Sequence, residues 1–150
     1  MKRGFTLIEL TVTIAIIVIV AGMLFTALNP AQRLAQARNS ERKSELNAIL
    51  SAVRENIVDT RTGLFNCAAG DVPTTTKKMS STGTSTYNIA PCLVPTYIFA
   101  LPFDPKTAGA HYTSTSDYNT GYTILQNATT SQITISAPGA ESGQSISVTR

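Results

Sequence analysis

The sequence predicts an α+β fold in which a long N-terminal helical spine packs against a small antiparallel β-sheet. Three patterns predict this class. Residues 10–32 carry no formal charge, and residues 14–28 are almost wholly apolar. Residues 46–57 place apolar side chains three and four positions apart, whereas residues 122–148 alternate apolar with polar side chains. A helix and a sheet that are each apolar on one face become stable when those faces pack together.

One long helix is expected from residue 5 to about residue 58. Its first half is apolar on every face, and about 20 such residues suffice for a helix to span a bilayer core. Its second half is amphipathic, with an apolar stripe of Leu46, Ile49, Leu50, Val53 and Ile57. Five charged residues fall largely off that stripe: Arg42, Lys43, Glu45, Arg54 and Glu55. The basic residues of 33–43 are therefore expected on a solvated helix face, or in salt bridges to other chains.

Pro30, preceded by Asn29, interrupts the helical pattern. Proline removes a backbone hydrogen bond and clashes with the preceding turn, so a kink or local unwinding is expected just before it. Gly22 is a second weak point in the same stretch. Alternatively, Asn29 ends one helix and Pro30 lies in the first turn of the next. Both interpretations give a helix, a flexible joint and a helix.

The C-terminal part is polar and changes period. Gly63 ends the helical pattern, and residues 66–96 form a loop-like stretch rich in Ser and Thr. Beyond it, three short alternating segments are marked by Tyr122, Ile124, Ile133, Ile135, Ile146 and Val148. Residues 97–101 are a further candidate strand. These segments predict the small antiparallel sheet that covers the apolar stripe of the helix.

Lys2 and Arg3 precede the apolar segment, and no second span follows. Because basic residues favour the cytoplasmic side, the short leader is expected to stay inside while the rest is exported. Cys67 and Cys92 then lie in an oxidising compartment, where they can pair; two free thiols are the alternative. A bridge closing that loop would contribute roughly 3 kcal/mol on the chain-entropy account.

Charge and composition argue against several classes of function. The chain has 12 Lys and Arg against 9 Asp and Glu, a net of +3; without Lys2 and Arg3 the balance is 10 against 9, or +1. Nucleic acid is therefore not expected as a partner. The single histidine, His111, has no organised nucleophile beside it in the sequence, so no enzyme activity, cofactor or metal is expected. Asp104 and Asp117 lack the spacing of a calcium loop and are expected in turns.

The first nine residues are the most informative. In a secretory signal the small-residue cleavage site follows the apolar stretch, whereas here the small residue Gly4 precedes it. Cleavage after Gly4 would leave the whole apolar helix on the mature chain. Glu9 then lies within that helix, where a carboxylate needs a partner. The new ammonium of Phe5 is four residues away on the same helix face, and a neighbouring chain's amine is within reach if chains stack.

The segment Lys2-Arg3-Gly4-Phe5-Thr6-Leu7-Ile8-Glu9-Leu10 resembles the processing motif of type IV pilins and pseudopilins. The resemblance implies cleavage after Gly4 by a prepilin peptidase, N-methylation of Phe5, and burial of Glu9 in a helical bundle at a fibre axis. It covers about residues 1–60, and the remainder is pilin-like only in its α+β architecture. Many pilins close a disulfide loop near the C-terminus, whereas Cys67 and Cys92 directly follow the helix here.

These observations divide the chain into a leader (1–4), a membrane and fibre-core helix (5–32), an amphipathic helix half (33–62) and a globular head (63–150). By resemblance, the expected function is a structural subunit of a type IV pilus filament, a homo-oligomer built by the pilus assembly machinery of the inner membrane. The chain would begin as a single-pass inner-membrane precursor and end in an extracellular filament on the cell surface. The alternatives are a pseudopilin of a type II secretion system, a minor or competence pilin, and, in another class, a non-polymerising signal-anchored surface binding protein.

Overall fold

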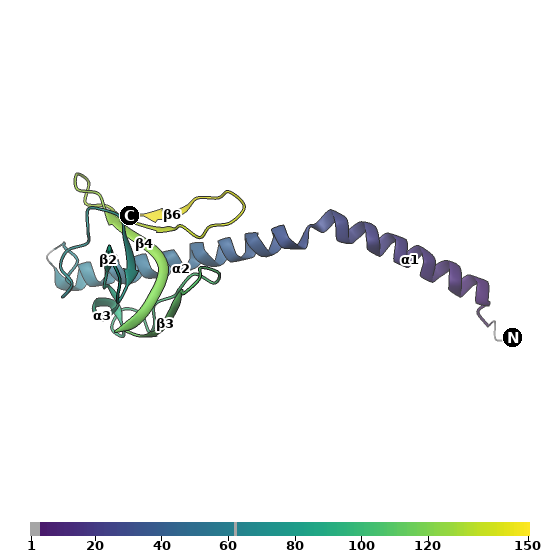
Figure 1. The fold of residues 1–150 in the computed structure, drawn as a ribbon, viewed down its shortest axis with the longest axis horizontal. Coiled ribbons are helices and arrows are strands. Elements are labelled where there is room, and N and C mark those ends of the chain that lie inside the picture. The colour runs from purple at the N-terminus through teal and green to yellow at the C-terminus, as the bar shows by residue number, and fades with distance from the viewer. Residues whose placement is uncertain (1–3, 62) are drawn as a thin grey trace. The chain divides into compact units, whose positions relative to one another are not determined.

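The structure is a computed structural model that describes residues 4–61 and 63–150, apart from the side chains of residues 26–28. Its contacts divide the chain into two units, Met1–Ala35 and Gln36–Arg150. The first unit contains helix α1 (Leu7–Leu28) and the start of helix α2 (Pro30–Thr60). The second unit contains the rest of α2 and the whole sheet (Figure 1). This long N-terminal helical region with a small sheet confirms the predicted α+β class.

Two consecutive helices replace the single helix that the apolar pattern predicts. Asn29 ends α1 in the left-handed region, at φ 38°, a conformation that asparagine adopts more readily than most residues. Pro30 begins α2, where its missing N–H costs nothing. The Asn29 carbonyl accepts hydrogen bonds from the backbone N–H groups of Gln32 at 3.0 Å and Arg33 at 3.2 Å. The joint therefore has the two-helix form, while Gly22 lies inside α1, which runs unbroken from Leu7 to Leu28.

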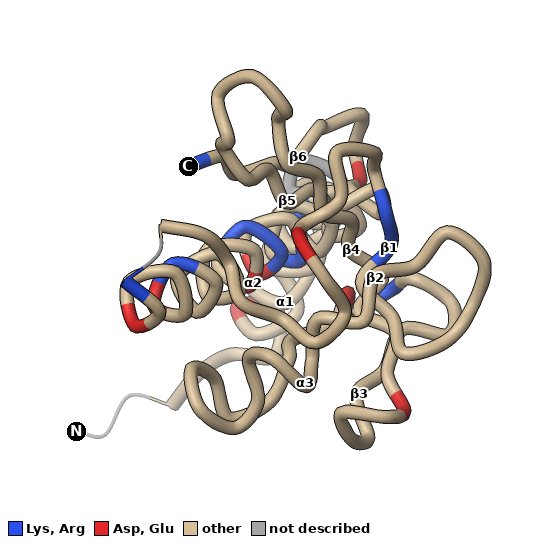
Figure 2. Tube along the Cα trace, turned by 90° about the vertical axis from the view of Figure 1, so that its left-hand side faces the viewer, with Lys and Arg blue, Asp and Glu red and all other residues tan. Residues whose placement is uncertain are grey.

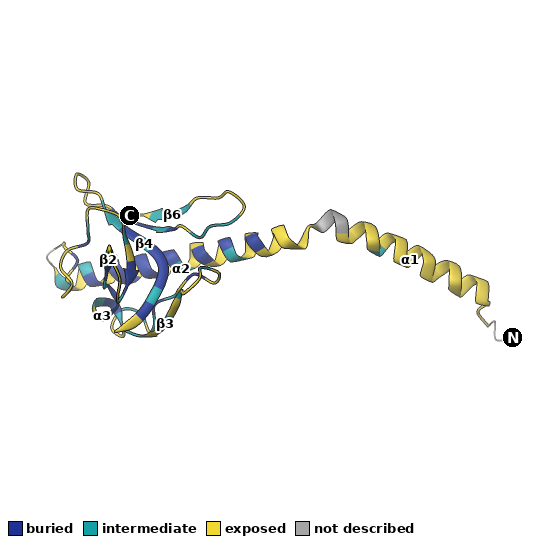
Figure 3. Cartoon of the chain, in the orientation of Figure 1, coloured by how far each residue is buried: buried dark blue, intermediate teal, exposed yellow. Residues whose placement is uncertain are grey.

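α2 buries one stripe of side chains beneath the sheet. Leu46, Ile49, Leu50 and Val53 are each at most 1% exposed. They pack in one core with residues of the strands and of the segment before β1, among them Val72, Met79, Tyr118, Tyr122, Ile124, Ile133 and Ile135. Burying each such leucine or isoleucine contributes about 1.5–3 kcal/mol. Buried positions recur along α2 wherever its face turns to this core, as Figure 3 shows in dark blue.

The sheet contains six strands in the order β2-β1-β4-β5-β6, with β3 paired to β4 off this path. Their bounds are β1 (Lys77–Ser80), β2 (Thr86–Tyr87), β3 (His111–Ser114), β4 (Asp117–Gln126), β5 (Ile133–Ala137) and β6 (Ile146–Thr149). β4, β5 and β6 contain the alternating residues that predict them. β1 and β2 pair in parallel, whereas the other pairs are antiparallel, so the sheet is mixed.

Two expectations for the middle of the chain are wrong. The stretch 66–96 is not only loop, because it contains β1, β2 and the short helix α3 (Ala90–Leu93). Residues 97–101 form no strand; the backbone N–H groups of Tyr97 and Ile98 instead donate to the Leu93 carbonyl and close a turn. Prolines at positions 95 and 102 flank residues 97–101, and proline has no N–H with which to join a ladder.

A disulfide joins Cys67 to Cys92 and closes a loop with a sequence separation of 25. Asn56 of α2 is 4% exposed and holds the base of that loop. Its Nδ2 donates to the carbonyls of Asn66 and Cys92, at 3.2 and 3.4 Å, and its Oδ1 accepts from the Asn66 N–H at 2.9 Å. The loop is therefore fixed to α2 by both a covalent and a hydrogen-bonded connection.

Candidate functional site

The residues around the predicted cleavage point lie outside helix α1. Gly4 and Phe5 precede the helix, and Phe5 is 85% exposed. Thr6 has an extended backbone and caps the helix, with its Oγ1 accepting from the Glu9 N–H at 3.3 Å. A Cβ built on Gly4 would meet no heavy atom within 4 Å. The Gly4–Phe5 peptide bond therefore lies in exposed, non-helical chain, the form in which proteases cut.

Glu9 occupies the first turn of α1 and is exposed. A carboxylate is favourable there because the helix N-terminus carries partial positive charge. The Glu9 carbonyl accepts a hydrogen bond from Thr13 Oγ1 at 2.6 Å. Within residues 4–61 and 63–150, the Glu9 carboxylate itself forms no hydrogen bond and no ion pair. In hydrocarbon such a carboxylate is costly unless a cation or a donor pairs with it.

The surface of α1 is apolar and uncovered. Within the described part of the chain, Leu7–Phe25 is the one helical stretch long and apolar enough to cross a membrane, with a mean hydropathy of 2.6 and none of it buried. Its large apolar side chains range from 48% exposed at Val20 to 82% at Leu7. The hydroxyls of Thr11 and Thr13 donate to carbonyls of the same helix, so they present little polarity outward. The described side chains of α1 are almost all exposed, which Figure 3 shows in yellow.

Residues 1–25 match the family described as the prokaryotic N-terminal methylation motif. The chain carries the type IV pilin and pseudopilin signature. Gly4, Phe5 and Glu9 all lie within the matched residues. The motif implies processing by a prepilin peptidase and assembly into pilus-like polymers, and the apolar helix behind it is a candidate membrane anchor. Pilin-type proteins are structural rather than catalytic. No curated protein and no solved structure matches the chain.

The second unit, Gln36–Arg150, contains a buried charge cluster that the sequence pattern does not reveal. Arg42 is 0% exposed, so the expectation that it faces solvent or another chain is wrong. Its Nε and Nη2 donate to the two carboxylate oxygens of Asp104, at 2.7 and 3.0 Å. Its Nη1 donates to Asn39 Oδ1 at 2.8 Å and to Glu141 Oε2 at 3.3 Å. Arg42 stands four positions before Leu46, so it continues the apolar stripe of α2 towards the N-terminus, and that spacing is the signal that could have placed it.

Contacts within this cluster keep the carboxylates of Asp104 and Glu141 ionised. Burial alone would raise the pKa of Asp104, but hydrogen bonds from Arg42 and from the N–H groups of Lys106 and Thr107 outweigh it and lower the pKa to about 2. Glu141 accepts from Arg38 Nε at 2.6 Å and from Lys106 Nζ at 2.6 Å. These contacts, with that of Arg42, hold the pKa of Glu141 well below its ordinary value. The cluster thereby ties α2 to the segments around Asp104 and Glu141.

The two aspartates weighed as calcium ligands have different partners. Asp104 lies in a turn, where its Oδ1 accepts from the N–H groups of Lys106 and Thr107. It is also buried and uses both oxygens on Arg42. Asp117 begins β4 on the surface, where its Oδ1 lies 3.1 Å from His111 Nε2. The backbone carbonyl of Gly109 and this carboxylate raise the pKa of His111, which lies in β3. The structure thus assigns Asp104 to the core of the head and Asp117 to a surface pair.

Glu45 also departs from the expected solvated face. It is half-buried and accepts a hydrogen bond from the hydroxyl of Tyr122, a residue of β4 that is fully buried. Burial raises the pKa of Glu45 above its ordinary value, and the hydrogen bond from Tyr122 only partly offsets that effect. Burial, followed by the bond to Glu45, raises the pKa of the Tyr122 hydroxyl. This pair adds a second polar connection between α2 and the sheet.

Proposed function

We propose that this chain is a structural subunit of a type IV pilus filament, cut after Gly4 and assembled through its apolar N-terminal helix. The observation that supports the proposal most is the bare apolar surface of α1 directly behind an exposed Gly4–Phe5 bond. An apolar surface of this kind is unfavourable in water and needs a cover. Lipid covers it in the precursor, and the α1 helices of other copies cover it in the fibre. This exchange costs little because lipid tails and apolar helices solvate α1 alike.

In this proposal residues 1–4 are the leader, residues 5–32 form the membrane and fibre-core helix, residues 33–62 form the amphipathic half, and residues 63–150 form the outer head. Processing frees the amino group of Phe5, which is then methylated. The Glu9 carboxylate pairs with the Phe5 ammonium of a neighbouring copy as that copy docks. An ion pair relieves the cost of keeping a carboxylate among apolar helices. The Cys67–Cys92 loop and the sheet face the outside of the cell.

Substitution of Glu9 tests this assembly role. Glu9→Ala should reduce the yield of sheared filaments strongly, while the amount of cleaved chain in the membrane stays unchanged, because the substitution removes docking and leaves the Gly4–Phe5 bond intact. Glu41→Ala, which removes an exposed carboxylate of α2, is the matched control and should leave the yield unchanged. Filaments as abundant with Glu9→Ala as with the native chain would overturn the role of Glu9. A native chain that is cleaved but never leaves the membrane would favour a pseudopilin or minor subunit.

A further inference from the structure

The exposed charges at the two ends of α2 oppose the helix dipole. The first turn contains Arg33 and no acidic residue, and the last turn contains Asp59 and no basic residue. A helix N-terminus favours carboxylates and a C-terminus favours cations, so both charges weaken the isolated helix. Violations of a local preference are expected where the residues serve a function. Figure 2 marks the basic residues of the chain in blue and the acidic ones in red, and α2 carries both.

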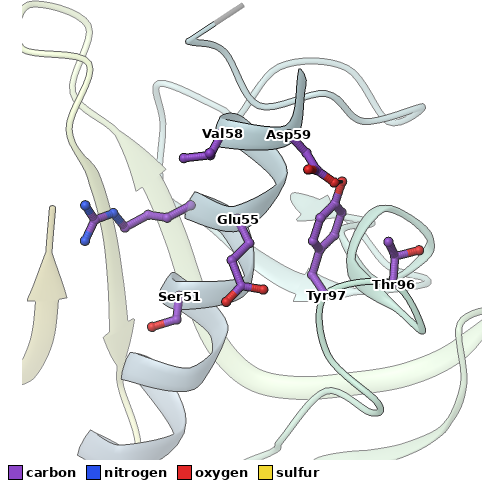
Figure 4. A pocket seen from close by; sticks show the side chains of 7 residues that line it. Ser51, Glu55, Val58, Asp59, Thr96 and Tyr97 are labelled. Atoms are coloured by element: carbon purple, nitrogen blue, oxygen red, sulfur yellow. Dashed lines mark hydrogen bonds between the residues drawn. The ribbon is translucent and has the colours of Figure 1, made fainter. Parts of the chain in front are cut away.

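An open groove of about 580 Å³ lies beside the acidic end of α2. One wall consists of α2 residues and the other of Thr96 and Tyr97 (Figure 4). The α2 residues are Ser51, Arg54, Glu55, Val58 and Asp59. Val58 is 75% exposed. The Tyr97 hydroxyl donates to Asp59 Oδ2 at 3.1 Å. Glu55 is exposed and forms no hydrogen bond or ion pair within the part of the chain that the structure describes. The groove thus combines apolar surface with two carboxylates, one of them unpaired, and one cation, Arg54, so carboxylates are in excess.

A lysine or arginine side chain complements this groove. Such side chains lay an aliphatic stem on apolar surface and keep the charged head at a polar edge. The stem of such a side chain would lie on Val58 or on the Tyr97 ring, and its head would lie near Glu55 or Asp59. Three exposed cations of α2, Arg33, Lys43 and Arg54, form no ion pair with a described residue. Arg54 lines the groove itself, which leaves Arg33 and Lys43 as the candidates.

We propose that this groove receives the basic first half of α2, with Arg33 and Lys43, from a second copy of the chain. Lys43 cannot reach Glu55 of its own chain, because the helix rises about 18 Å between them. The contact therefore joins two different surfaces on two copies. Such heterologous contacts do not close on themselves and continue as open helical assemblies. Each contact also brings cations to an acidic helix end, which relieves the unfavourable charge on α2. The proposal rests on the filament function but does not depend on where the leader is cut.

Zero-length cross-linking with a carbodiimide tests the pairing in the native filament. The reagent joins a carboxylate to an amine in direct contact, and peptide mass spectrometry identifies the pair. We expect an amide bond between Lys43 and Glu55 or Asp59, which by the helix geometry can only join two copies. Cross-links from Glu55 and Asp59 solely to Lys77, Lys78 or Lys106, or to no lysine, would overturn the proposal. If the native chain forms no filaments, the same cross-linking is carried out on membranes, so that the pairing is tested separately from the filament function. A cross-link from Lys43 to Glu55 or Asp59 there supports the pairing, and its absence rejects the pairing.

Charge reversal gives an independent test. Glu55→Lys with Asp59→Lys should lower the filament yield at least about tenfold, while the disulfide and the membrane level of the chain stay unchanged. Adding Arg33→Glu and Lys43→Glu to the same chain should restore the yield, because the two charge patterns exchange places. Asp71→Lys, at an exposed carboxylate of the disulfide loop, is the matched control and should assemble normally. A fourfold variant that assembles no better than the twofold one would contradict the pairing.

Discussion

Arg42 and Asp104 are 62 positions apart in the sequence and meet side-on, with Nε–Oδ2 at 2.7 Å and Nη2–Oδ1 at 3.0 Å. Neither side chain is exposed. Two parallel charge-assisted hydrogen bonds make this a strong and geometrically specific contact. Burying both charges also costs desolvation, so the pair contributes less to net stability than its geometry suggests, whereas loss of one partner leaves a buried charge unpaired. The pair therefore fixes the segment around Asp104 to α2.

Removal of one partner should destabilise the head strongly. We expect Asp104→Ala to lower the free energy of unfolding by about 3–5 kcal/mol, because Arg42 remains buried without its carboxylate. Denaturant titration of the full chain in detergent, followed by near-ultraviolet circular dichroism of its tyrosines, measures this loss. The double variant Arg42→Met with Asp104→Leu is the control, since an apolar pair of similar volume should recover most of the stability. A loss below about 1 kcal/mol for Asp104→Ala would show that the pair is unimportant.

The same pair predicts loss of stability in acid. Folding lowers the pKa of Asp104 from 3.8 to about 2, so its contribution is fully present above pH 3.8 and disappears as the pH falls to about 2. Glu141 acts in the same direction, because its pKa is also lowered. Glu45 acts in the opposite direction: burial raises its pKa, so its contribution is present in acid and is lost as the pH rises. Unfolding measured from pH 5 to pH 2 should show the fall in the native chain and a flatter profile for Asp104→Asn.

A side chain at position 139 should disturb the cluster directly. A Cβ on Gly139 would lie 2.6 Å from Thr107 Oγ1 and 2.7 Å from Asp104 Oδ2. We expect Gly139→Ala to cost about 1–3 kcal/mol, as overpacked substitutions do. Combining it with Thr107→Ala removes one of the two close contacts and should recover part of the loss. Equal unfolding free energies for the native chain and Gly139→Ala would mean that this segment packs differently from the structure described.

The disulfide should stabilise the head mainly through the unfolded chain. With a sequence separation of 25, the Cys67–Cys92 bridge should contribute about 3 kcal/mol on the chain-entropy account. The double variant Cys67→Ser with Cys92→Ser should therefore unfold at lower denaturant concentration than the native chain. Reductant should shift the native chain towards that midpoint and leave the double variant unaffected. Insensitivity of the native midpoint to complete reduction would contradict the prediction.

Much of the fold was predictable because apolar residues repeat at the period of the element that contains them. Leu46 to Val53 do so for α2, and Ile133 with Ile135 does so for β5. β1 was not predictable in this way: Lys77 and Lys78 lead a strand whose buried residues are Met79 and Ser80. Its extended conformation depends on pairing with β4, and the local sequence pattern does not predict such a long-range contact.

The candidate site likewise contains one part that the sequence predicts and one part that it does not. The order of Gly4, Phe5 and Glu9 along the chain was sufficient to propose processing, because that order is chemically unusual for a secretory signal. The buried cluster was not predictable from residue type, since arginine is almost never fully buried unless paired, and its partner Asp104 is distant in sequence. The four-residue spacing from Arg42 to Leu46 indicated a position on the buried face of α2. The charge of arginine, however, favoured an exposed position, and the prediction followed the charge.

The central claim is that the chain is cleaved at Gly4 and built into a filament. The most direct measurement is the intact mass and N-terminal peptide of the chain in filaments sheared from the cell surface. The account predicts an abundant species that begins at methylated Phe5 and retains the Cys67–Cys92 bridge. A chain that still begins at Met1, or that is absent from the sheared fraction, would contradict it.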